Sequence, residues 1–351
     1  MKKIVLGKTG LEITQLGFGG IPIQRLTEEG AVEIVKKVVD MGVTYLDTAN
    51  GYTTSEERIG KAVAGRRENL VIATKTGART AEGVREHLAL SLKRLDTDYI
   101  DIYQFHGVSD MESLEKVMDP NGPMGVVKEA RDKGQIRHIS ITSHSMEVAK
   151  EAVKTDKFET LMFPFNFIAR EAEYDLIPLC REHNVGFIAM KPLAGGMLDN
   201  ATIAFKYLFQ FPDIVTIPGI EQAWEIEEIF SLYESSQEMT SAEAEEIQRM
   251  RDELGTRFCR RCNYCQPCSA DIPISTVMTS ASFAKRMPPE RFFSGMLEGA
   301  MEKANNCIEC GECEERCPYD LPIRDMIKEQ REWFWEEKKK YDEAMIGIGD
   351  E

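Results

Sequence analysis

Short apolar segments rich in β-branched and aromatic residues alternate with amphipathic stretches over roughly the first 250 residues. This alternation is typical of repeated βα units, in which a helix follows each buried strand. Eight consecutive units favour a closed α/β barrel, the (β/α)8 TIM barrel, over an open sheet. The predicted strands are LGFGG (16–20), YLDTA (45–49), LVIATKT (70–76), DIYQFH (101–106), HISITSH (138–144), TLMFPFN (160–166), GFIAMKPL (186–193) and IVTIPGI (214–220).

Two local patterns flank the first predicted strand. Residues 4–14, IVLGKTGLEIT, alternate around a KTG turn, which predicts a hairpin that closes the floor of the barrel. Residues 27–41 predict a helix, with Thr27 as its N-cap and Gly42 just past its end.

The pattern changes after the eighth segment. Residues 241–254 predict a charged helix, and from Gly255 the composition shifts to cysteine, proline and arginine. We therefore predict a barrel domain over 1–254 and a mainly helical, cysteine-rich domain over 255–351. The second domain ends in a charged helix with two tryptophans, which we interpret as a docking or capping helix.

The overall composition narrows the possible partners. A formal net charge of −16 argues against nucleic acid, because affinity for the phosphate backbone comes from clustered Lys and Arg. No run of roughly 18 apolar residues is present, so no membrane-spanning segment is expected. The first residues, MKKIVLGKTGLEI, lack the features of a secretory signal, and we expect a cytoplasmic protein.

Eight of the nine cysteines lie in two dense groups. The second group, CIECGECEERCP, matches in full the bacterial ferredoxin pattern C-x2-C-x2-C-x3-C-P. The first group, CRRCNYCQPC, closes one residue earlier, and Ser269 stands where proline is usual. SADIPI after the first group aligns with PYDLPI after the second, which indicates an internal repeat. The candidate metal ligands are Cys259, Cys262, Cys265, Cys268, Cys307, Cys310, Cys313 and Cys317.

These groups resemble the two-cluster ferredoxins, and the resemblance implies two 4Fe-4S clusters. In such ferredoxins the fourth ligand of each cluster comes from the other group, so Cys317 would complete the first site and Cys268 the second. Structural zinc is a less favoured alternative, because zinc modules pair two C-x2-C knuckles across a dozen or more residues. Disulfides would be unusual in a reducing cytosol. Cys180, which stands apart, is interpreted as a buried thiol.

Four polar residues follow successive predicted strands, where a barrel of this type carries its chemistry. In this order Asp47, Tyr52, Lys75 and His106 resemble the catalytic tetrad of the aldo-keto reductases. DTANGYTTSEERIG resembles the family pattern D-T-A-x-x-Y-G-x-S-E-x-x-x-G, with Thr53 in place of glycine. The resemblance covers roughly residues 1–250. With the cysteine domain it points to an iron-sulfur-containing branch of that family.

The resemblance also implies roles for these four residues. Tyr52 would donate a proton to a carbonyl oxygen as hydride reaches the carbon, and His106 would orient the carbonyl. Lys75 would favour the phenolate, and Asp47 would hold the lysine. A free tyrosine, with a pKa near 10, is otherwise a poor acid–base group at neutral pH.

The nicotinamide contacts of that family are altered in this sequence. Its serine–asparagine pair is replaced by Thr142 and Ser143, Met162 lies near its glutamine position, and residues 214–233 contain no Lys or Arg to clamp a 2′-phosphate. Glycine-rich loops after the seventh and eighth strands still predict a phosphate site. The expected cofactor contacts are Thr142, Ser143, Asn166, Met190, Lys191, Leu193, Gly195, Gly196, Pro218 and Gly219.

Electron counting bears on the choice of cofactor. Nicotinamides pass two electrons together, a 4Fe-4S cluster passes one, and a flavin does both. The leading hypothesis is therefore an oxidoreductase whose clusters relay electrons from a ferredoxin-type donor to a barrel-bound cofactor, FMN being slightly favoured over NAD(P)H. Its substrate would be a small molecule with a carbonyl or related unsaturated group. The alternatives are an NAD(P)H-dependent carbonyl reductase with structural clusters and a non-catalytic electron-transfer subunit.

Overall fold

The computed structural model describes residues 1–235 and 238–348, and these form two compact units that divide between Ile247 and Gln248. The division falls within helix α10 (Ser241–Leu254), whose end adjoins the predicted domain boundary. That boundary stays a prediction. Each unit has its own hydrophobic core and is described separately below.

The first unit is built on eight parallel strands that follow one another in chain order. Parallel bridges from Leu16 to Thr216 and from Gly19 to Gly219 join the first strand to the last and close the sheet. The predicted TIM barrel is confirmed, and each of the eight predicted segments contains or overlaps one strand. These are β3 (Phe18–Gly19), β4 (Tyr45–Asp47), β5 (Val71–Thr76), β6 (Ile100–Phe105), β7 (Ile136–Thr142), β8 (Thr160–Pro164), β9 (Gly186–Met190) and β10 (Val215–Ile217).

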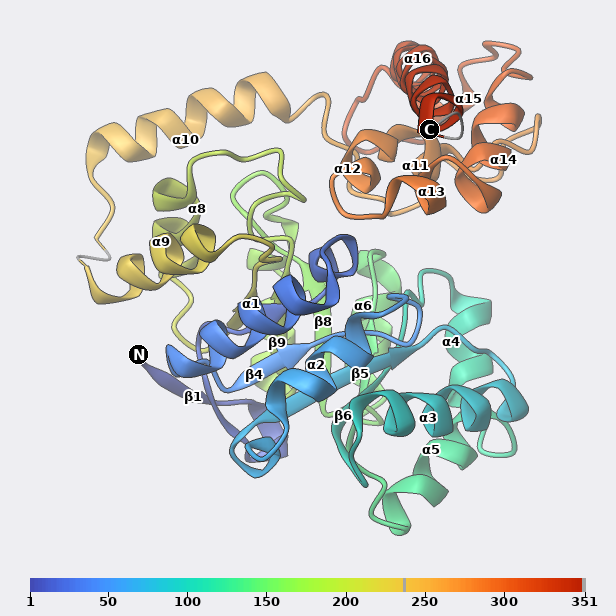
Figure 1. Ribbon diagram of the computed structural model, residues 1–351. Helices are drawn as coiled ribbons and strands as arrows, with labels where there is room; N and C mark the ends of the chain where they lie inside the picture. Colours follow the sequence, from blue (N-terminus) through green and yellow to red (C-terminus); the bar gives the residue numbers. More distant parts are fainter. Residues whose placement is uncertain (236–237, 349–351) are drawn as a thin grey trace. The chain divides into compact units, whose positions relative to one another are not determined.

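Helices surround these strands (Figure 1). The predicted first helix is confirmed as α1 (Glu28–Asp40), where the Thr27 hydroxyl accepts a hydrogen bond from the amide of Gly30. The others are α2 (Ser55–Val63), α3 (Ala81–Leu95), α4 (Met111–Met118), α5 (Pro123–Asp132), α6 (Met146–Lys154), α7 (Leu176–Glu182), α8 (Ala201–Leu208) and α9 (Ala223–Glu234). Short 3-10 helices are η1 (Gly7–Thr9), η2 (Pro22–Arg25), η3 (Arg67–Asn69) and η4 (Glu171–Glu173).

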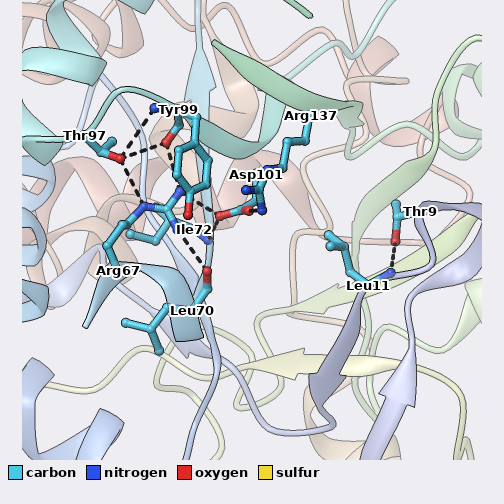
Figure 2. A network of polar contacts seen from close by, with 9 residues as sticks. All are labelled: Thr9, Leu11, Arg67, Leu70, Ile72, Thr97, Tyr99, Asp101 and Arg137. Carbon is cyan, nitrogen blue, oxygen red and sulfur yellow. Dashed lines mark hydrogen bonds and ion pairs between the residues drawn. The ribbon is translucent and has the colours of Figure 1, made fainter. Parts of the chain in front are cut away.

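The predicted hairpin is also present. Strands β1 (Lys3–Val5) and β2 (Glu12–Thr14) pair antiparallel, and Thr9 accepts a hydrogen bond from the amide of Leu11 in the turn (Figure 2). Ile4 and Ile13 belong to one buried cluster with barrel residues such as Val71 and Val215, which begin their strands. The hairpin therefore fills the amino-terminal end of the barrel with apolar side chains.

A charged network lies at the amino-terminal ends of β5 and β6 (Figure 2). The carboxylate of Asp101, fully buried, contacts Arg67 at 2.7 Å and Arg137 at 2.8 Å, and accepts a hydrogen bond from the amide of Ile72. Both guanidinium groups lie over the ring of Tyr99, at 4.1 and 4.0 Å from its centroid. Because its partners come from different βα units, this network stabilises the barrel at the end opposite the predicted chemistry.

The second unit is mainly helical, as predicted. Its core combines Phe292 and Phe334 with apolar residues of the surrounding helices, and it includes the thiols of Cys265 and Cys313. Its helices are α11 (Ile274–Met278), α12 (Ser280–Ala284), α13 (Pro289–Phe292), α14 (Gly295–Ala304), α15 (Glu312–Glu315) and α16 (Ile323–Ile348). Among the helices of the described chain, none is long and apolar enough to cross a membrane.

Candidate functional site

The four tetrad residues meet at the carboxyl-terminal end of the barrel. Asp47 ends β4, Lys75 lies near the end of β5, and His106 directly follows β6. Tyr52 lies in the loop after β4, whose backbone is tied to β5 by the hydrogen bond from the amide of Asn50 to the carbonyl of Lys75. Because the strands are parallel and in register, residues far apart in sequence share one edge.

Asp47 and Lys75 form a buried ion pair. The ammonium of Lys75 contacts the Asp47 carboxylate and donates to the carbonyl of Thr48 at 2.6 Å. Burial raises the pKa of Asp47 in spite of the adjacent cation. Burial alone would lower the pKa of Lys75, but the charges of Asp47 and Tyr52 raise it above its ordinary value. Lys75 is therefore a buried cation within the site.

Tyr52 and His106 form the outer part of the constellation. The Tyr52 ring centroid lies 4.9 Å from Lys75 Nζ, and the ring meets the His106 imidazole edge-on, with centroids 5.7 Å apart. Both side chains are partly exposed, whereas Asp47 and Lys75 are buried. A phenol thus adjoins both a buried cation and a partly exposed imidazole, an arrangement suited to proton transfer at the carboxyl-terminal end of the barrel.

A polar layer inside the barrel extends the ion pair and was not predicted from the sequence. Gln104 donates to the free oxygen of Asp47 at 2.9 Å and accepts from Ser140 at 3.4 Å, and Thr160 donates to Ser140 at 2.6 Å. Lys75, Gln104, Ser140 and Thr160 are successive register partners across β5 to β8. The sequence did carry a signal for Gln104, because it precedes His106 by two positions and so lies on the same face of the strand.

Thr53, the departure from the family pattern, adopts a left-handed backbone with φ of +38°. This conformation favours glycine, which explains the glycine in the pattern that the sequence resembles. The Thr53 hydroxyl donates to the side-chain oxygen of Gln24 at 3.0 Å. Thr53 therefore carries some backbone strain, while its side chain links the Tyr52 loop to η2.

Three predicted cofactor residues lie buried at strand ends with their polar atoms engaged by neighbouring backbone. Thr142 accepts from the amide of Gly107 at 2.8 Å, and Ser143 bonds the backbone of Ser145. The Asn166 amide donates to the carbonyl of Lys191 at 2.9 Å, while its oxygen accepts from two backbone amides. These contacts order the loops, and they compete with a cofactor for the same atoms.

The predicted loop after β9 is tightly wound. Residues 194–196 are consecutive left-handed positions, and Lys191 has a φ of +59°. The carbonyl of Leu193, three residues beyond Met190 at the end of β9, accepts from the amide of Gly196 at 2.8 Å. Lys191 Nζ lies 3.0 Å from the Nε2 atom of His144, a neighbour not predicted from the sequence. The side chain of Lys191 therefore places a cation beside this loop, where a phosphate is predicted.

Pro218 and Gly219 lie where the barrel closes. The Pro218 carbonyl accepts from the amide of Gly19 at 2.8 Å, and a Cβ atom at position 219 would lie 2.7 Å from the ring of Pro22. The close approach of Pro22 in η2 therefore favours glycine at position 219, a structural reason beside the predicted phosphate role.

The cysteines of the second unit line two cavities. The first cavity, about 320 Å³, is lined by Cys259, Cys262, Cys265 and Cys317. The second cavity, about 380 Å³, is lined by Cys268, Cys307, Cys310 and Cys313, with Cys265 on its wall as well. Each pairs three cysteines of one group with the last cysteine of the other, as the resemblance to two-cluster ferredoxins implied.

The chemistry of both cavities fits 4Fe-4S clusters. Each offers four sulfur donors against apolar walls, with Met278, Leu321 and Ile323 around the first cavity and Ile272 and Ile327 around the second. Thiolates are the ligands of such clusters. Cys180, in contrast, is buried on α7, where burial raises its pKa to about 12.

The barrel and its acid–base constellation define a class of oxidoreductases, and comparison with known proteins identifies it. Residues 3–203 match the Aldo/keto reductase family and residues 258–322 match the 4Fe-4S dicluster domain. The chain belongs to the aldo/keto reductase family and carries a 4Fe-4S domain after its barrel.

Two similar proteins come from Bacillus subtilis (strain 168). Uncharacterized oxidoreductase YqkF is 32% identical over 213 residues, 56% of this chain and 67% of the relative. Aldo-keto reductase YhdN is 30% identical over 233 residues, 61% of this chain and 68% of the relative.

Solved structures agree on the barrel. The holo form of aldo-keto reductase AKR11C1 from Bacillus halodurans has a TM-score of 0.63 at 26% identity, over 71% of this chain and 96% of that one. An aldo-keto reductase from Klebsiella pneumoniae in complex with NADPH has a TM-score of 0.62 at 20% identity, over 71% and 95%. The second likeness shows the fold alone.

Proposed function

We propose that the barrel reduces a carbonyl or related unsaturated group of a small molecule, with Tyr52 as the proton donor. The observation that carries this proposal is the position of the Tyr52 ring, 4.9 Å from the buried Lys75 ammonium and edge-on to His106. Reduction of a carbonyl adds a hydride to carbon and a proton to oxygen, so a positioned acid is needed.

Each neighbour of Tyr52 has a distinct part in this proposal. Lys75 stabilises the phenolate left when the proton departs, and Asp47 keeps the lysine charged and in place. His106, partly exposed at the rim, orients the substrate oxygen toward the phenol. Expulsion of water by the substrate would strengthen these interactions, because charges attract more strongly at low dielectric.

In the second unit we assign the four cysteines around each cavity as the ligands of one 4Fe-4S cluster. Bound there, the clusters would pass one electron at a time. The loop around the second cavity is accessible, since Cys310 is exposed and Ile308 is 69% exposed. A ferredoxin-type donor could therefore approach this side of the unit.

FMN is the proposed barrel cofactor, because it joins one-electron to two-electron chemistry. The glycine-rich loop beside Lys191 offers a place for the phosphate. NAD(P)H is the second candidate, because the Klebsiella pneumoniae neighbour of the same fold is in complex with NADPH.

The test uses the full chain, purified anaerobically, with a reduced viologen as donor and a panel of aldehydes, ketones and enones. The wild type should reduce at least one compound class. Tyr52→Phe, which removes only the hydroxyl, should lose roughly 100-fold or more of that rate. Tyr99→Phe, at the other end of the barrel, is the matched control. Equal rates in the two variants would contradict the role of Tyr52 as the proton donor.

A second assay separates the two cofactors. Substrate-dependent oxidation of NADPH that does not depend on the reduction state of the clusters would support the nicotinamide alternative with structural clusters. Release of stoichiometric flavin on denaturation of the protein would support FMN.

A further inference from the structure

Arg79 lies in the loop between β5 and α3, at the same end of the barrel as the tetrad. Thr76 ties this loop to the strand ends, because its hydroxyl accepts a hydrogen bond from the amide of Ala78 at 3.1 Å and its carbonyl accepts from the amide of His106 at 2.8 Å. The guanidinium then reaches the end of the next strand, where Nη2 donates to the carbonyl of His106 at 2.7 Å. Arg79 is thus fixed against the backbone of a tetrad residue.

The guanidinium of Arg79 keeps part of its hydrogen-bonding capacity. Besides the bond to His106, Nη1 donates to the carbonyls of Gly77 at 3.1 Å and Ala78 at 3.3 Å. A guanidinium has more N–H donors than these bonds use. Within residues 1–235 and 238–348, its Nε donates to no acceptor. A further acceptor can therefore bind without displacing the three carbonyls.

No carboxylate is in contact with Arg79. In the part of the chain that the structure describes it forms no ion pair, and its hydrogen-bond partners are neutral carbonyls. Asp110, the N-cap of α4, acts on it from farther away, and the oxygens of Asp110 already accept from the amide and hydroxyl of Ser113. Burial lowers the pKa of Arg79, although Asp110 acts in the opposite direction. A partly buried cation is usually stabilised by a counter-ion in contact, which a bound anion would supply here.

The place of Arg79 around the barrel separates it from the predicted cofactor phosphate. Strands β5 and β9 are separated by β6, β7 and β8 in the sheet, which closes between β3 and β10. The two strands therefore lie on opposite sides of the barrel. The loop after β9 carries Lys191 and the predicted phosphate site, whereas the loop after β5 carries Arg79 beside the tetrad. Arg79 is therefore placed to bind a substrate and not the cofactor phosphate.

We propose that Arg79 binds a carboxylate of the substrate, so that the carbonyl to be reduced belongs to an organic acid. This inference rests on the proposed reduction with Tyr52 as proton donor, and it names the class of substrate. A carboxylate matches the planar fork of a guanidinium and supplies the counter-charge. Because Arg79 is bonded to the backbone of His106, the anion is held on the side of the site where the imidazole orients the carbonyl. Two points of attachment fix the orientation of the substrate.

The experiment uses the full chain with a reduced viologen and a set of carbonyl acids, formylbenzoate isomers and open-chain oxo acids, each paired with its neutral amide. In the wild type at least one acid should exceed its amide in kcat/KM by roughly tenfold to a hundredfold, the value of a charged hydrogen bond. Arg79→Gln should bring this ratio to about one, mainly by raising KM of the acid. Arg85→Gln removes an exposed α3 cation that pairs with Glu129, and as the matched control it should keep the ratio.

Arg79→Lys keeps the charge without the planar fork, so it should give an intermediate ratio. This variant keeps the test available if Arg79→Gln does not fold. Binding of each acid, measured by calorimetry without a reductant, gives a readout that does not depend on turnover, and it should weaken in both variants.

The outcomes separate the carboxylate site from the proposed reduction. If the acids bind through Arg79 but no compound is reduced, the reduction is contradicted and the carboxylate site is supported. If compounds are reduced but no acid exceeds its amide, the carboxylate site is overturned. It is also overturned if Arg79→Gln lowers kcat/KM of an acid and its amide by the same factor, because Arg79 then only positions the backbone of His106.

Discussion

The barrel site and the cysteine cavities reach their final arrangement in different ways. In the barrel, Lys75 already has its partners in Asp47 and the Thr48 carbonyl, and Gln104 occupies the other oxygen of the carboxylate. In the second unit, the thiols border cavities, and two of them belong to the hydrophobic core. The chain completes the acid–base site by itself, whereas the cluster sites depend on the inorganic group to complete the core.

Removal of iron should give the largest loss of amide protection, and this loss should be confined to the second unit. Binding of a metal group to a site that the unfolded chain lacks contributes directly to folding free energy. We expect an anaerobic chelator to abolish amide protection of α11 and α14, which pack in the core that contains Cys265 and Cys313. Strands β5 and β6 should keep their protection in hydrogen-exchange mass spectrometry. Loss of protection in both units would contradict the independence of the barrel.

Lys75→Met should have the next largest effect, confined to the barrel. Loss of the cation removes support for the phenolate and leaves Asp47 buried without its partner, at a cost of about 3–5 kcal/mol in unfolding free energy. Asp47→Asn combined with Lys75→Met should recover most of that stability but not the reductase rate. Chemical denaturation and turnover measure the two quantities separately, and EPR signals of the clusters should remain unchanged in both variants.

The same variant should show a specific pH dependence. Burial raises the pKa of Asp47 even beside Lys75, and removal of the cation raises it further. The folded protein then holds this proton at pH values where the unfolded chain, with an ordinary aspartate, has lost it. The stability of Lys75→Met relative to wild type should therefore be greatest at low pH and fall as the pH rises toward the folded pKa of Asp47. A relative stability that increases with pH would contradict an unpaired buried carboxyl.

Arg67→Met tests the opposite end of the barrel. It removes one of the two cations that neutralise the buried Asp101, so we expect a loss of about 2–3 kcal/mol in unfolding free energy. Turnover at saturating substrate should not change, because the network lies at the amino-terminal ends of the strands. A fall in rate with unchanged stability would contradict the assignment of stability to this end of the barrel and of catalysis to the opposite end.

Gln104→Leu should have a smaller effect on the same chemistry as Lys75→Met. The Asp47 oxygen loses a 2.9 Å hydrogen bond but keeps the lysine, and an unsatisfied buried acceptor costs about 1–3 kcal/mol. We expect a shifted pH–rate profile and a roughly tenfold lower rate, the equivalent of about 1.4 kcal/mol. Gln104→Glu should not restore the wild-type profile, because it places a second carboxylate beside Asp47. A pH–rate profile identical to wild type in Gln104→Leu would exclude a positioning role.

Thr53→Gly should give the smallest effect. Glycine relieves the left-handed backbone but removes the hydrogen bond to Gln24, so two terms of about 1 kcal/mol oppose each other. The unfolding free energy should change by less than about 1 kcal/mol. A larger loss of stability would show that the link to η2, and not backbone strain, dominates at this position.

Local sequence patterns were sufficient to predict the barrel strands and the two cysteine groups. The strands are short, apolar and punctuated, and the cysteine groups carry their spacing in the chain itself. The links from Gln104 to Ser140 and Thr160 were missed because they depend on the register of strands that are far apart in sequence. The engagement of Asn166 by the Lys191 carbonyl was missed for the same reason. Pairing across loops is a three-dimensional property that local patterns do not encode.

The most direct test of the account is the content of iron, acid-labile sulfide and flavin in full-length protein purified without oxygen. We predict about eight iron and eight sulfide per chain, the content of two 4Fe-4S clusters, with about one flavin released on denaturation. Full iron and sulfide without flavin would contradict a barrel fed by the clusters through FMN. Bound zinc in place of iron would contradict the cluster assignment itself.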